Sequence, residues 1–223
     1  MRNAEQILSE QLVKRGFLKK GKNIFSLLKN DIIVIIGFEK PTNLLYIQFA
    51  IIPLFLPCPG YIYYSYGNRL NNAFLDVGIL EKGSNQDTVQ MFCKTIIHHI
   101  DNDLLPFAKS ISYAEMLCAY MEKRKRLFSF SSATIVCPPE KAERLVLYGY
   151  LYLKLYDKAR KATNNYVRLI KTSKTYTEEL KTKKLSECEE ILELLSLKRN
   201  NEIAELIDKN IKDNLELISA EDD

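Results

Sequence analysis

The sequence predicts an α+β fold, in which an N-terminal helix and a small antiparallel sheet with packing helices precede a C-terminal all-helical array. Three observations lead to this prediction. Two apolar runs, residues 23–28 and 32–38, are joined by a short polar link at 29–31, which is typical of a hairpin. Apolar residues recur at helical spacing between residues 85 and 104. After Pro139 the helical pattern continues to the end.

Length and composition are those of a globular protein. The chain has 223 residues, of which 47% are hydrophobic and 27% charged, so one or two domains with a substantial core are expected. We place a boundary at Pro138, which gives an α+β domain over residues 1–137 and a helical domain over residues 138–223. The net charge of +4 is too small to indicate nucleic-acid binding by the chain as a whole.

The first third of the chain predicts a helix followed by strands. Apolar residues within 3–15 share one helical face, and Gly16 is suited to end that helix. Residues 41–68 carry no charge, but their four prolines each remove a backbone hydrogen bond that lipid cannot replace, so we expect no membrane span. Strands are predicted at about residues 23–29, 31–39, 44–52 and 61–66.

The remainder predicts helices. One covers residues 85–104 and ends at Pro106, and a shorter one covers residues 112–126. Residues 128–137 are serine-rich and suit either an additional strand or an interdomain linker. Four helices with short links follow, which is typical of antiparallel hairpins, at roughly residues 140–154, 156–171, 175–197 and 201–218.

Charge is distributed unevenly over these last helices. Residues 140–184 hold twelve Lys/Arg and five Asp/Glu, whereas residues 185–223 hold four Lys/Arg and twelve Asp/Glu. Two solvated helix faces that attract each other explain this pattern, and a basic patch that binds an anion is the alternative.

The N-terminal segment combines the runs 12–17 (LVKRGF), 19–25 (KKGKNIF) and 33–40 with Asn68-Arg69-Leu70. In these runs it resembles a bacterial family, the domain of unknown function 4304. The resemblance covers about the first third of the chain and implies an α+β unit with a helix against an antiparallel sheet. That family has no established activity, so the resemblance implies no reaction.

A second resemblance lies in the helical part. Residues 155–159 (LYDKA) are similar to the turn of a tetratricopeptide-like helical hairpin, in which an aromatic and a small residue let two helices pack closely. No second copy follows at the spacing of that repeat, so the resemblance implies a helical hairpin and no peptide-binding residues.

The sequence shows no pattern of catalysis or metal binding. The five cysteines are widely spaced without a CxxC pair, which indicates reduced thiols in a cytoplasmic protein. Neither a phosphate-binding loop nor a nucleophile elbow is present. His98 and His99 lie near Asp101 and Asp103, but adjacent histidines point in different directions and no third ligand is evident. We therefore predict no metal and no cofactor.

The leading prediction is a non-enzymatic protein that binds another protein. Tyrosine combines an apolar body with a polar tip, which suits contact surfaces, and residues 148, 152 and 156 share one helical stripe. Packing within the core explains the same stripe. The predicted partner-binding residues are Tyr61, Tyr63, Arg69, Tyr148, Tyr152 and Tyr156.

Two alternatives remain open. Nucleic acid could bind basic residues interleaved with aromatics, provided that they share one face. A small-molecule or enzymatic site in the sheet domain is the other alternative. The residues of the nucleic-acid alternative are Lys19, Lys20, Lys22, Lys123, Arg124, Lys125 and Arg126.

Overall fold

The computed structural model describes residues 2–58, 66–125, 135 and 137–219. The predicted α+β class is confirmed: an N-terminal helix and a small antiparallel sheet precede an array of helices. The sheet half contains α1 (Arg2–Lys14), β1 (Leu18–Lys20), β2 (Ile24–Lys29), β3 (Ile32–Glu39), β4 (Leu44–Pro53), β5 (Gly67–Arg69), α2 (Leu70–Ala73), β6 (Leu80–Glu81), α3 (Gln86–His99), α4 (Leu105–Ser110) and α5 (Ala114–Lys125).

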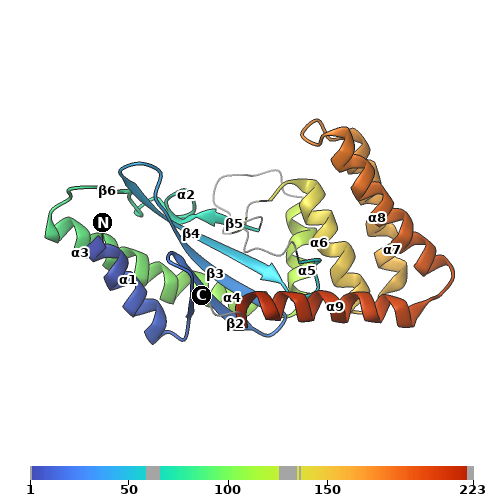
Figure 1. Cartoon of the computed structure of the whole chain (residues 1–223), viewed down its shortest axis with the longest axis horizontal. Coiled ribbons are helices and arrows are strands. Elements are labelled where there is room, and N and C mark those ends of the chain that lie inside the picture. The colour runs from blue at the N-terminus through green and yellow to red at the C-terminus, as the bar shows by residue number, and fades with distance from the viewer. Residues whose placement is uncertain (1, 59–65, 126–134, 136, 220–223) are drawn as a thin grey trace.

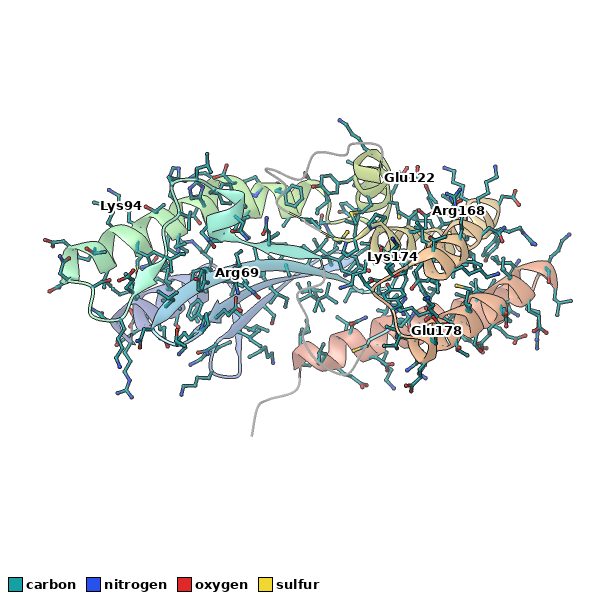
Figure 2. The ribbon with its side chains drawn as sticks, turned by 90° about the horizontal axis from the view of Figure 1, so that it is seen from above. Arg69, Lys94, Glu122, Arg168, Lys174 and Glu178 are labelled. Carbon is teal, nitrogen blue, oxygen red and sulfur yellow. The ribbon has the colours of Figure 1, made fainter. Side chains whose placement is uncertain are left out.

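The sheet is antiparallel throughout its described strands, in the order β1-β2-β3-β4-β5, and β6 pairs with the start of β4. Helices lie on both sides of it: α3 and α4 run along one side, and α9 lies on the other (Figure 2). Two-sided cover explains the composition of β3, in which Ile32 to Phe38 are all buried. Alternate residues pack into different clusters, for example Val34 with α1 and Ile35 with the end of α9.

The path of the chain at Pro106 differs from the prediction. Instead of ending there, the helix passes through a π-helical turn at Ile100–Leu104, in which the Leu105 N–H donates to the Ile100 carbonyl, and continues as α4. Pro106 lies in the first turn of α4. Because proline has no backbone N–H, the ladder of helix hydrogen bonds is interrupted at Pro106, directly after the π-helical turn.

The four predicted C-terminal helices are α6 (Pro139–Tyr152), α7 (Tyr156–Thr172), α8 (Glu178–Ser196) and α9 (Asn200–Ser219). The first three stand beside one end of the sheet, and α9 runs from their outer end back beneath them to the sheet (Figure 1). The buried Asn210 and Asn214 hold α9 in place, because their amides donate to the carbonyls of Leu54, Phe55 and Leu56.

The two halves meet at the β2–β3 turn. One carboxylate oxygen of Asp31 accepts from the Ala114 N–H of α5 and the other from the Tyr152 hydroxyl of α6. One continuous cluster of buried side chains runs from α1 through the sheet to α8 and α9. The boundary proposed at Pro138 coincides with the start of α6, and the division into two domains stays a prediction.

Candidate functional site

The tyrosines predicted on one helical stripe have different environments. Tyr148 is 2% exposed, and its hydroxyl donates to Glu187 Oε1 at 2.7 Å. Burial, reinforced by Glu187, raises the pKa of Tyr148 well above its ordinary value. Its assignment to a partner-binding surface is therefore wrong, because α7 and α8 cover this side of α6 and the phenol serves the interior.

Tyr152 joins the array to the sheet. Its ring stacks on Phe55 at 5.6 Å between centroids, and its hydroxyl donates to Asp31 at 3.1 Å. Burial and the neighbouring Asp31 carboxylate raise the pKa of the phenol. These contacts give Tyr152 a structural role in the described chain, which matches the packing explanation of the stripe.

Tyr156 lies at a pocket. It is the first residue of α7, half-buried, at the turn that follows α6. The α6–α7 and α8–α9 turns together line a pocket of about 530 Å³, which we call the end pocket. Its lining residues are Lys154, Leu155, Tyr156, Asp157, Lys158, Arg160, Leu195, Lys198 and Asn200.

The end pocket combines an apolar interior with a cationic rim. Leu155 and Tyr156 come from one turn, and the buried Leu195 from the other helix pair. Four of the lining residues are cations, whereas Asp157 is the one acid among them. Within the part of the chain that the structure describes, none of the four cations has a carboxylate oxygen within 4 Å.

The contacts that two of these cations make within the chain are with uncharged groups. One guanidinium nitrogen of Arg160 donates to the Leu195 carbonyl at 2.8 Å, which holds the side chain across the two helix pairs. Lys158 lies 5.5 Å from the centre of the Tyr150 ring. Lys158 also lines a second pocket that contains Glu122 and Glu143. Without Lys158, the rim still holds Lys154, Arg160 and Lys198 against the single acid Asp157, so it carries an excess of positive charge.

Two of the rim lysines occupy left-handed backbone positions. Lys154 and Lys198 have φ angles of 58° and 55°. In each case the N–H of the next residue returns to the preceding helix, from Leu155 to the Tyr150 carbonyl and from Arg199 to the Leu194 carbonyl. This is the Schellman ending, at which glycine is favoured because a side chain is strained there. Lysine at both positions accepts a strained backbone and places a positive charge at the end pocket.

A second pocket, of about 350 Å³, lies between α5, α6 and α7. It contains carboxylates and ammonium groups together, from Glu122, Glu143, Lys158 and Lys161, with Tyr150 and Asn165 beside them. The Asn165 amide donates to Glu143 at 3.3 Å. Its acids and bases balance, so it lacks the charge excess of the end pocket.

Arg69 lies on the sheet, as Figure 2 shows. Its guanidinium donates to both Glu39 oxygens, at 2.8 and 2.7 Å, and lies 4.5 Å from the centre of the Tyr46 ring. The hydrogen bonds to Glu39 raise the pKa of Arg69. Its charge is therefore already matched within the fold.

The residues of the nucleic-acid alternative are not gathered on one surface where the structure describes them. Lys19 and Lys20 belong to the edge strand β1, and Lys22 to the turn after it. Lys123 lies near the end of α5, next to Glu122, which Figure 2 places beside the helical array and away from β1. Tyr61, Tyr63 and Arg126 lie outside the described residues, as do the side chains of Arg124 and Lys125.

The structure gives His99 a second carboxylate partner that the sequence did not indicate. Its two ring nitrogens face Asp103 and Asp76, each at 2.8 Å, and its ring stacks on Phe74. Asp76 is distant in sequence and lies in no motif, so only the fold brings it to the histidine. Among the described residues, no group of three or more His, Cys, Asp or Glu side chains could hold a metal ion.

Within the described ranges, none of the helices combines the length and apolar character needed to cross a bilayer. Comparison with protein-family models, with curated proteins and with solved structures finds no match. The resemblances to the domain of unknown function 4304 and to a tetratricopeptide-like hairpin therefore stay predictions.

Proposed function

We propose that the chain is a protein-binding module and that the end pocket receives its partner. The observation that carries the proposal is the combination, on one surface, of the exposed Leu155 and the half-buried Tyr156 with cations that have no carboxylate in the described chain. An aromatic residue beside leucine, surrounded by a charged rim, is the usual composition of a protein contact site. Tyr156, a residue predicted from the sequence to bind a partner, lies in this pocket.

The structure also offers a reason to prefer binding over catalysis at this site. The end pocket contains one carboxylate, four cations and no histidine, cysteine or serine among its lining residues. Nucleophilic and general acid–base mechanisms use a nucleophile with a base within hydrogen-bond reach, and this lining supplies no such pair.

The test is selection of ligands from a random peptide library, followed by affinity measurement with two matched variants. Leu155→Asn makes the pocket polar while keeping a residue suited to the start of α7. Leu180→Asn is the control, because Leu155 and Leu180 are both 39% exposed and only Leu155 lines the pocket. We expect Leu155→Asn to weaken binding of selected peptides about tenfold, the equivalent of losing one leucine contact.

The control should bind as the unmodified chain does. Failure of the chain to select any peptide, or equal affinity for both variants, would contradict the proposed function. Circular dichroism of both variants shows whether the helices are retained, so that lost binding is attributed to the pocket.

A further inference from the structure

We propose that the segment received by the end pocket is an acidic peptide of the partner protein, with an apolar side chain flanked by carboxylates. This inference rests on the proposed function and adds the chemistry of the partner. Its argument starts from the charges of the rim.

The rim cations differ from the arginines that serve the fold. Arg15, Arg69 and Arg144 each contact a carboxylate within the chain. Lys154, Lys158, Arg160 and Lys198 contact none among the described residues, although all four lie around one pocket. An excess of positive charge at one place is complementary to a partner that supplies negative charge.

Arg160 is prepared for such a partner. Its bond to the Leu195 carbonyl uses one guanidinium nitrogen and fixes the side chain between the two turns. The remaining N–H groups are free to make the forked contact with a carboxylate that arginine forms readily. The side chain is thus ordered before binding, which reduces the entropy lost on association.

The charges of the neighbouring helices also favour binding of an acidic peptide at the end pocket. Residues 185–223, which cover α8 from Leu185 onward and all of α9, hold twelve acidic and four basic residues. An acidic segment is repelled by those acidic faces and attracted to the rim, so the field of the array itself directs it to the pocket.

The apolar lining distinguishes a peptide from simpler anions. A phosphate or a single carboxylate needs only cations and N–H groups, whereas Leu155, Tyr156 and Leu195 offer apolar contact as well. Single-stranded nucleic acid needs aromatic platforms for successive bases, and Tyr156 is the one aromatic residue of the lining. A peptide that alternates apolar and acidic side chains matches both parts of the pocket.

The experiment measures fluorescence anisotropy of a synthetic peptide of alternating Glu and Leu, and of the same peptide with Gln in place of each Glu. The variants are Lys154→Gln with Lys198→Gln, and, as a charge-matched control away from the pocket, Lys94→Gln with Lys109→Gln; all four lysines are exposed. We expect the unmodified chain to prefer the Glu peptide, and the pocket variant to lose about five- to tenfold in affinity for it. The control should retain its affinity, and added salt should weaken binding of the Glu peptide more than that of the Gln peptide.

The outcomes separate the two proposals. Equal affinity for the Glu and Gln peptides would overturn the acidic partner while leaving the protein-binding function intact. Tighter binding of a fluorescent oligonucleotide or of inorganic phosphate, lost in the pocket variant, would overturn it in favour of another anion. A dimer in sedimentation experiments that the pocket variant loses would identify a second copy of the chain as the occupant instead. Absence of binding to any peptide would contradict the proposed function itself.

Discussion

The sheet half and the outer end of the helical array use their cations differently. In the sheet half, Arg15 pairs with Asp101, Lys40 with Glu5, and Arg69 with Glu39. At the end of the array, four cations surround a pocket without such partners among the described residues. The difference teaches that these three paired cations connect elements of the sheet half, whereas the four cations of the end pocket make no ion pair within the described chain. Cations that line a pocket without an internal carboxylate are available to a partner.

A second difference concerns the backbone. Left-handed backbone occurs in the sheet half at Gly16, Gly21 and Gly83, and also at the non-glycine residues Asn30 and Thr42. In the array it occurs at Lys154 and Lys198, and these two line the end pocket. A strained backbone at a pocket is the pattern expected where function opposes stability.

The largest effect is expected at Arg144, the paired cation of α6. Its Nε and Nη2 lie 3.1 and 3.0 Å from Glu187 Oε1, which also accepts from Tyr148, and both charged side chains are mostly covered. Burial opposes the guanidinium charge, but Glu187 outweighs it and raises the pKa of Arg144. Arg144→Met should lower the free energy of unfolding by about 3 kcal/mol, measured with urea, because the mostly covered Glu187 then loses the guanidinium that contacts it.

The control for Arg144 removes both charges. Arg144→Met together with Glu187→Leu should recover much of the loss, since replacing a whole ion pair by apolar groups is often close to neutral. If the double variant were as unstable as the single one, the lost free energy of unfolding would come from lost packing. The contrast between the paired cation Arg144 and the cations of the end pocket would then weaken.

The helical array was more predictable from sequence than its contacts were. Apolar spacing predicted all four helices because it repeats with the helical period, and the breaks near residues 156 and 198 carry polar residues. The same periodicity could not separate Tyr148 from Tyr156. Residues on one stripe are equivalent until the neighbours are placed, and only packing shows that α7 and α8 cover the first and leave the second at a turn.

Long-range polar contacts explain the other failures of prediction. Asn210 and Asn214 are buried because the carbonyls of residues 54–56 need donors, and nothing near either asparagine in the sequence indicates this. The end pocket likewise joins two turns about forty residues apart. The left-handed lysines gave no signal either, because the sequence shows lysine where a glycine would have marked the helix ending.

A smaller effect, of opposite sign, is expected at the rim. Lys154→Gly and Lys198→Gly should each raise the free energy of unfolding by about 0.5–1 kcal/mol, because glycine adopts the left-handed conformation without strain. Lys154→Gln and Lys198→Gln keep the strain and should leave stability nearly unchanged. Urea unfolding of the four variants, compared with their affinity for the Glu peptide, measures both quantities.

Stabilisation by glycine combined with weaker peptide binding would show that the rim lysines are retained for binding. Destabilisation by glycine would mean that their side chains support the turns, and the end pocket would then resemble the sheet half in its use of charge.

The smallest effect is expected for the exposed fork between Arg15 and Asp101. Arg15 Nε and Nη2 each lie 2.6 Å from an Asp101 oxygen, and this hydrogen bonding lowers the pKa of Asp101. A carboxyl group whose pKa is lower in the folded state stabilises the fold above its unfolded pKa, about 3.9, and the contribution is lost as the pH falls through the lower folded value. Asp101→Asn should therefore cost about 0.2–1 kcal/mol at pH 7 and almost nothing near pH 2, measured as the difference in urea unfolding between the two chains. A difference that stayed constant across this range would show that Asp101 acts through its shape and not its charge.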